Sequence, residues 1–313
     1  MPYDPPDDAQ DPTPGAGIGL IILTVGSAVV ALVGWLIYRY LFVAVVAVGL
    51  CSAASAGPIG VYFLAGQSNA AGFAPADGLP DYLADQPDVL YRPTTGLVRT
   101  LGPVNGTMGP EITLGRSLAD AGGDPIAIVK FAIGGTSMLD WAPNGGKRYA
   151  GLVLRMNSTL GYLSNAGYTP TVRGGFWVQG EEDALYGDLA ASYAEHLEEL
   201  LAAFRANWGA ELPIGIARIN APIRPYRDLV RDAQAEAADW HTTVWNTDDL
   251  PLHDAVHYDQ LGQLRLGRRF ASDAIGWRYR VETLPSQRGV PEPGAWAMLA
   301  IGCSAILARR RSL

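Results

Sequence analysis

The sequence contains little cysteine and little histidine, with two and four of them in 313 residues. Both cysteines, Cys51 and Cys303, stand in apolar stretches near the two ends, so the region between them is predicted to have neither disulfides nor thiol chemistry. Positive charge is also scarce, with 23 Lys and Arg against 31 Asp and Glu. A net charge of −8 predicts no nucleic-acid partner, because phosphate binding requires a basic surface.

The best candidate nucleophile does not stand in the motif of the α/β-hydrolases. Residues 61–65 are an apolar run that predicts a buried strand, and Ser68 is the first nucleophilic side chain after the turn that ends it. Position 70 is alanine, whereas the Gly-x-Ser-x-Gly elbow requires glycine there. The pattern therefore keeps Ser68 as a candidate nucleophile and disfavours the α/β-hydrolase fold.

The N-terminal segment, residues 1–56, is predicted to direct the chain to a membrane. An uncharged apolar stretch runs from Ala16 to Tyr38, Arg39 interrupts it, and a second apolar stretch leads to Ala54-Ser55-Ala56, a small-x-small pattern that signal peptidase cleaves. The alternatives are a hairpin of two membrane segments and a signal peptide after an over-extended start, of which we favour the second. Both place the following domain outside the cytoplasm.

The C-terminus, residues 290–313, carries a second targeting pattern. Val290-Pro291-Glu292-Pro293-Gly294 precedes an apolar run at 295–308 and then Arg309-Arg310-Arg311. This order resembles the PEP-CTERM sorting signal of Gram-negative bacteria, which implies an exosortase as partner and a link to exopolysaccharide. The alternative is a plain membrane anchor. We expect an exported protein at the membrane, on the cell surface or outside the cell, with a domain at 57–277 and a linker at 278–289.

Strand and helix patterns alternate through the predicted domain. The predicted strands cover residues 61–65, 89–91, 126–133, 174–178, 213–218 and 242–245. The predicted helices cover residues 109–122, 148–165, 185–207, 226–240 and 261–275, and residues 69–87 are expected to be irregular. This alternation predicts an α/β fold, a three-layer α/β/α sandwich with a central parallel sheet.

Polar and small residues follow several of these strands directly. Gly134-Gly135 ends one strand and Gln179-Gly180-Glu181-Glu182-Asp183 follows another; the carboxyl ends of strands in an open α/β sheet border the ligand crevice. Asp254 and His257 stand three residues apart before the last helix, and a nucleophilic serine needs a base and an orienting carboxylate. His253 is the competing base, and a surface His-Asp cluster or a metal site is the alternative.

Five blocks together resemble the sialate O-acetylesterase-like family of carbohydrate acetylesterases, in the SGNH hydrolase superfamily. They are Gly66-Gln67-Ser68-Asn69, Gly109-Pro110-Glu111, Gly134-Gly135-Thr136, Gln179-Gly180-Glu181-Glu182-Asp183 and Asp254-Ala255-Val256-His257, and the resemblance spans residues 59–274. It implies that Ser68 is the nucleophile, His257 the general base and Asp254 its orienting partner, without metal or other cofactor. It also implies an oxyanion hole formed by the N–H of Ser68, the N–H of Gly134 or Gly135 and the side-chain amide of Gln179.

The resemblance assigns supporting places to Gln67, Asn69, Glu181 and Asp183, and for the last two we prefer structural support of the Gln179 loop over a direct catalytic part. Further pocket candidates, which nothing in the sequence ranks, are Asp140, Trp141, Tyr186 and Arg224.

The expected function is that of an extracytoplasmic serine esterase that removes O-acetyl groups from a carbohydrate of the sialic acid, xylan or exopolysaccharide type through an acyl-enzyme. Two alternatives stay open: an O-acetyltransferase that acts on exopolysaccharide with the same site, and a surface-anchored carbohydrate-binding module without activity. The intact set of Ser68, Asp254 and His257 disfavours the binding module.

Overall fold

The computed structural model describes residues 33–37, 39 and 57–283. Contacts divide the chain into two units, residues 1–55 and 56–313, and the folded domain at 57–283 belongs to the second. Within the described residues, no helix is both long and apolar enough to cross a membrane. Most of the predicted N-terminal membrane segments and the whole C-terminal sorting signal lie outside the described residues.

A seven-stranded sheet in the order β4-β3-β6-β1-β7-β8-β9 forms the centre of the domain. All neighbours are parallel except β3 and β4, which pair antiparallel. The strands are β1 (Gly57–Gly66), β3 (Gln86–Arg92), β4 (Arg99–Leu101), β6 (Ile126–Ala132), β7 (Tyr168–Val178), β8 (Ile214–Ala217) and β9 (Thr242–Trp245). A separate antiparallel pair joins β2 (Ala74–Pro75) to β5 (Thr107–Met108).

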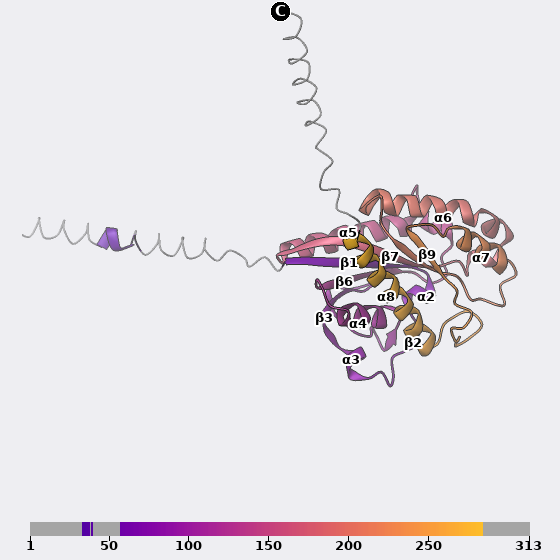
Figure 1. The fold of residues 1–313 in the computed structure, drawn as a ribbon, viewed down its shortest axis with the longest axis horizontal. Helices are drawn as coiled ribbons and strands as arrows, with labels where there is room; N and C mark the ends of the chain where they lie inside the picture. Colours follow the sequence, from indigo (N-terminus) through magenta and orange to yellow (C-terminus); the bar gives the residue numbers. More distant parts are fainter. Residues whose placement is uncertain (1–32, 38, 40–56, 284–313) are drawn as a thin grey trace, which may run out of the picture. The chain divides into compact units, whose positions relative to one another are not determined.

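Helices cover both faces of the sheet (Figure 1). The helices are α2 (Ser68–Ala71), α3 (Asp81–Ala84), α4 (Glu111–Asp120), α5 (Lys147–Asn165), α6 (Gly187–Trp208), α7 (Arg227–Glu236) and α8 (Gln260–Thr283), with 3₁₀ turns at η1 (Met138–Trp141) and η2 (Asp183–Leu185). One core contains buried side chains of α5, α6 and α7, and the other contains those of α4 and α8. This arrangement confirms the predicted three-layer sandwich.

Strand β1 supplies side chains to both cores because successive side chains of a strand point to opposite faces. Val61 and Phe63 belong to one core, and Tyr62 and Leu64 to the other. All four are at most 1% exposed. Burial on both faces explains why the sequence reads as a continuous apolar run rather than as an alternating one.

The structure adds two strands that the sequence did not predict, β4 and β5, and corrects the prediction elsewhere. Residues 69–87, expected to be irregular, include α2, β2 and α3 and the start of β3. Strand β7 begins six residues before the predicted Gly174, and the glycines lie inside it because the ring of Phe63 fills the space that a side chain at Gly175 would need. Helix α8 continues to Thr283, so the first half of the predicted linker at 278–289 is helical. The helix ends just before Leu284, because the residue that precedes a proline, here Pro285, disfavours the helical conformation.

The order of the strands decides where a ligand can bind. Within this sheet, β3, β4 and β6 lie on one side of β1, and the later strands β7, β8 and β9 lie on its other side. Ligands of open α/β sheets bind outside the carboxyl ends of the strands, at the point where the order reverses. Ser68 follows β1, Gly134 follows β6 and Gln179 follows β7, so three predicted site residues meet at this point.

A buried ion pair supports the turn that follows β1. The Lys130 ammonium of β6 lies 2.9 Å from the Glu111 carboxylate of α4 and donates a 2.6 Å hydrogen bond to the carbonyl of Ala71. Lys130 is 6% exposed and Glu111 is 1% exposed. Glu111 belongs to the Gly109-Pro110-Glu111 block, which therefore acts beneath the Ser68 turn rather than in the crevice.

Lys130→Ala should destabilise the fold by about 3–5 kcal/mol, because it leaves the carboxylate of Glu111 buried without its charge partner. Arg116→Ala is the matched control, since the pairs of Arg116 with Asp88 and Asp120 are partly exposed and such pairs contribute about 1 kcal/mol or less. Urea unfolding of both variants measures the difference. Equal losses would contradict the supporting role of the Lys130–Glu111 pair.

Candidate active site

Ser68, His257 and Asp254 form a hydrogen-bonded line across the end of the sheet. The His257 Nε2 atom lies 3.0 Å from Ser68 Oγ, and His257 Nδ1 lies 2.8 Å from Asp254 Oδ2. Ser68 and His257 are separated by 189 positions in the sequence. The structure therefore brings together the three residues that the sequence predicted as nucleophile, base and orienting carboxylate, in the arrangement of a catalytic triad.

Asp254 accepts hydrogen bonds that keep it charged. Desolvation would raise the pKa of its carboxyl, but hydrogen bonds from the His257 ring and from the backbone N–H groups of His257 and Val256 outweigh it and lower the pKa to about 2. Asp254 is therefore an anion at neutral pH. An anion at this place holds Nδ1–H of His257 and leaves Nε2 to accept the proton of Ser68.

Asn69 joins the nucleophile turn to the histidine loop. Its side chain donates to the carbonyl of Val256 at 3.0 Å and accepts from the N–H of Tyr258 at 3.0 Å. It also donates a 2.6 Å hydrogen bond to the carboxylate of Glu181. Asn69 thus holds the residues on either side of His257, and this contact accounts for the asparagine directly after Ser68.

Gln67 and Glu181 connect the Ser68 turn to the loop that follows β7. The Gln67 side-chain oxygen accepts from the N–H groups of Gly180 and Glu182, each at 3.4 Å. Glu181 is 0% exposed, and burial raises the pKa of its carboxyl. Through these contacts Gln67 and Asn69 join the Ser68 turn to the loop after β7, and Glu181 lies against Asn69.

The N–H groups of Ser68, Gly134 and Gly135 are available to a substrate oxygen. Within the described part of the chain, none of the three donates to a protein acceptor. A methyl group at Gly134 would lie 3.7 Å from Ser68 Cβ, so this turn borders the nucleophile. Gly134 and Gly135 are both exposed. Unpaired backbone donors beside a nucleophile suit an oxyanion.

The hydrogen bonds of Gln179 contradict the prediction that its side-chain amide donates to an oxyanion. Its Nε2 donates to the carbonyl of Thr136 at 2.9 Å and also to the carboxylate of Asp183, which uses both hydrogens. The side chain is 0% exposed. Asp183 accepts in turn from the N–H of Met138 at 3.0 Å. Gln179 and Asp183 therefore hold the turn that carries Gly134 and Gly135, and act on the oxyanion donors indirectly.

The four further pocket candidates differ in their exposure to solvent. Trp141 is 0% exposed and belongs to the core, and Asp140 caps the short helix η1 through the N–H of Ser137. Tyr186 is 51% exposed and Arg224 is partly exposed, so both are accessible to a ligand.

Sequence reasoning missed Phe73, which lies beside the triad. Its ring meets the His257 ring edge-on at 6.3 Å and is 58% exposed. Its position only five residues after Ser68 in the sequence is the feature that could have indicated a place near the nucleophile.

The alternative of a metal site around His253 finds no support in the described residues, which contain no group of three or more His, Cys, Asp or Glu suited to a metal. His253 instead donates its backbone N–H to the carbonyl of His257 at 2.7 Å and closes the loop. Its side chain is exposed.

A profile of the family described as carbohydrate esterase, sialic acid-specific acetylesterase, matches residues 58–276. The chain belongs to this family. The carbohydrate esterase is thus a hydrolase of the ester-cleaving type. No curated protein sequence matches it.

Solved structures similar to this carbohydrate esterase include a protein from Arabidopsis thaliana, with 23% identity, a TM-score of 0.62 and coverage of 70% of this chain and 98% of that one. NanS has 17% identity, a TM-score of 0.59 and coverage of 71% and 98%. A carbohydrate acetylesterase from Xanthomonas citri has 20% identity, a TM-score of 0.54 and coverage of 70% and 56%. At such low sequence identity, the structural similarity shows a shared fold and nothing further.

Replacing the two histidines of the loop should separate their roles in this carbohydrate esterase. His257→Ala should lower kcat on p-nitrophenyl acetate by about 10³-fold or more, because Ser68 loses its base. His253→Ala should lower it less than about fivefold, since only its backbone contributes to the loop. Similar losses from both variants would contradict the assignment of His257 as the base.

Replacing Gln179 should affect stability as well as catalysis. Gln179→Ala removes two buried hydrogen bonds and should destabilise the carbohydrate esterase by roughly 2–4 kcal/mol, because two buried acceptors lose their donor. It should also lower kcat by displacing Gly134 and Gly135. A residue that only donated to the oxyanion would lower kcat and leave urea unfolding unchanged, and that result would restore the first prediction.

Proposed function

We propose that the protein is a serine esterase that removes O-acetyl groups from carbohydrate through an acetyl-enzyme. The proposal depends on one observation: the 3.0 Å and 2.8 Å contacts that link Ser68, His257 and Asp254 beside the N–H groups of Gly134 and Gly135. Family membership supports the ester-cleaving chemistry.

In the first half of the reaction, His257 Nε2 takes the proton of Ser68 as Oγ attacks the acetyl carbonyl carbon. The carbonyl oxygen becomes an oxyanion that accepts hydrogen bonds from Ser68 and the Gly134-Gly135 turn. When this intermediate collapses, the bond to the sugar oxygen breaks and His257 gives its proton to that oxygen. The products are a free sugar hydroxyl and an acetyl group on Ser68.

In the second half, a water molecule gives a proton to His257 and attacks the acetyl carbon. The bond to Ser68 Oγ then breaks, His257 returns the proton to Oγ, and acetate leaves. The charge of Asp254 stabilises the imidazolium in both halves. No step requires a redox change or a second substrate other than water.

The position of Phe73 supports a sugar as the leaving group. Because His257 must reach the leaving oxygen, the sugar lies on the His257 side of Ser68, where the exposed ring of Phe73 stands. Sugar rings present C–H faces that pack on aromatic rings. Sialic acid, xylan and exopolysaccharide all carry such rings, and they are the substrate types we propose.

We also propose that the esterase acts outside the cytoplasm, at the membrane or the cell surface. The sequence supports this through the apolar stretches at 16–38 and 41–50 and through the pattern at 290–313 that resembles a PEP-CTERM signal. An exosortase-type enzyme would be the sorting partner. Under this proposal residues 57–277 are the esterase domain.

Hydrolysis assays with p-nitrophenyl acetate, acetylated xylan and O-acetylated sialic acid test the proposal. The protein should release acetate from the small ester and from at least one of the two carbohydrates, and Ser68→Ala should reduce both activities by about 10³-fold or more with unchanged urea unfolding. Substantial activity in Ser68→Ala, or no acetate from any of these substrates with the unaltered protein, would refute the function.

A further inference from the structure

A cavity lies at the opposite end of the sheet from Ser68. It has a volume of about 460 Å³, within the range of ligand pockets. Its walls include the early part of β7, Thr171 to Arg173, and the residues just before β8 and β9, Pro213 and His241. No residue of the catalytic loop or of the strand-end motifs lines it, so it is separate from the crevice that holds the triad.

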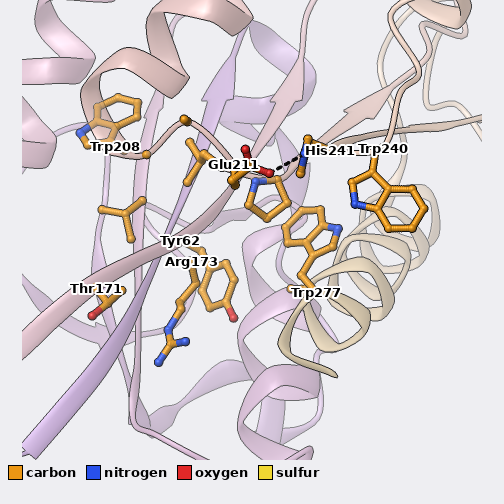
Figure 2. Close-up of a pocket in the computed structure, with 14 residues that line it drawn as sticks. Tyr62, Thr171, Arg173, Trp208, Glu211, Trp240, His241 and Trp277 are labelled. Atoms are coloured by element: carbon orange, nitrogen blue, oxygen red, sulfur yellow. Dashed lines mark ion pairs between the residues drawn. The ribbon is translucent and has the colours of Figure 1, made fainter. Parts of the chain in front are cut away.

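Aromatic rings make up much of the cavity wall (Figure 2). Figure 2 shows Trp208 on one side of the pocket and Trp240 and Trp277 on the other, with Tyr62 between them in this view. Tyr62 and Trp277 are 1% and 5% exposed, whereas Trp240 is 71% exposed. The cavity thus has a buried aromatic floor and an aromatic edge that reaches solvent.

Core aromatics hold two of these indoles in fixed orientations. Trp277 stacks on Phe176, with ring centroids 5.3 Å apart and planes at 19°. Trp208 lies 5.0 Å from Phe63, measured between ring centroids. Rings fixed in this way lose little freedom when a ligand binds against them, which favours binding.

Two polar side chains of the cavity wall, those of His241 and Arg173, lie beside carboxylates. The His241 ring lies 2.8 Å from the carboxylate of Glu211, and the Arg173 guanidinium lies 3.1 Å from the carboxylate of Asp124. Each of these two nitrogen-bearing side chains therefore lies beside a carboxylate, and the cavity offers both hydrogen-bond donors and acceptors. An ionic ligand would have to displace one of these partners.

We propose that this cavity binds an uncharged saccharide, as a carbohydrate site distinct from the catalytic one. A pyranose ring has apolar C–H faces edged by hydroxyl groups, so its faces match the rigid indoles and its hydroxyls match the Arg173, Glu211 and His241 side chains. An aliphatic ligand would make no use of those polar side chains, and an anionic sugar would meet the carboxylate of Glu211. The site would hold a polymer while the crevice acts elsewhere on it.

Affinity electrophoresis of the full chain tests the proposal with three uncharged polymers as probes: alkali-deacetylated xylan, dextran and pullulan. Because these polymers carry no acetyl ester, retardation reports binding without turnover and is independent of the proposed esterase activity. At least one polymer should retard the protein, and Trp240→Ala should weaken that binding by about tenfold, the scale of an aromatic contact residue. Its unfolding temperature should match that of the parent, because Trp240 is largely exposed.

Three further variants separate this cavity from other surfaces. Tyr82→Ala, which removes an aromatic ring that is 59% exposed and does not line the cavity, should keep the parent affinity, and Phe73→Ala, beside the triad, should weaken binding less than Trp240→Ala. Ala210→Trp should weaken binding by filling the cavity from a position that is exposed. The proposal is refuted if no polymer retards the protein, if Trp240→Ala and Ala210→Trp bind like the parent, or if Phe73→Ala alone abolishes binding.

Discussion

The side chain of Asn69 is the contact on which the catalytic arrangement depends. The nucleophile stands at the end of β1 and its base stands 189 positions later, so no local interaction can set the distance between them. Asn69 bonds to Val256, Tyr258 and Glu181 at once and is 0% exposed. Through this one amide, the turn that aims Ser68 and the loop that aims His257 become a single rigid unit.

Much of the fold could be predicted because its signals are local. The apolar run of β1 and the long periodic helix α6 are visible in the sequence, and their alternation with other elements indicates the parallel sheet. The two-residue strands β2 and β5 could not be predicted, since two residues are too few to show an alternation of apolar and polar side chains. The extension of β7 through its glycines depends on Phe63, whose ring is 112 positions away from Gly175.

The site shows the same division between what local spacing reveals and what packing decides. The three-residue spacing of Asp254 and His257 predicted their contact, because a short loop can present both. The role of Gln179 could not be read in this way, since its amide donates to whichever acceptor the fold places beside it. Here the fold supplies Thr136 and Asp183. The Lys130–Glu111 pair also went unpredicted, because its partners come from separate elements.

Rapid-quench peptide mass spectrometry tests the central claim most directly. The protein is mixed with p-nitrophenyl acetate, quenched with acid within the first turnover, digested and searched for acetylated peptides. The account predicts one acetyl group on the peptide that contains Ser68, lost on continued incubation and absent from Ser68→Ala. Full turnover with no acetyl group on Ser68, or with the acetyl group on another side chain, would contradict the account.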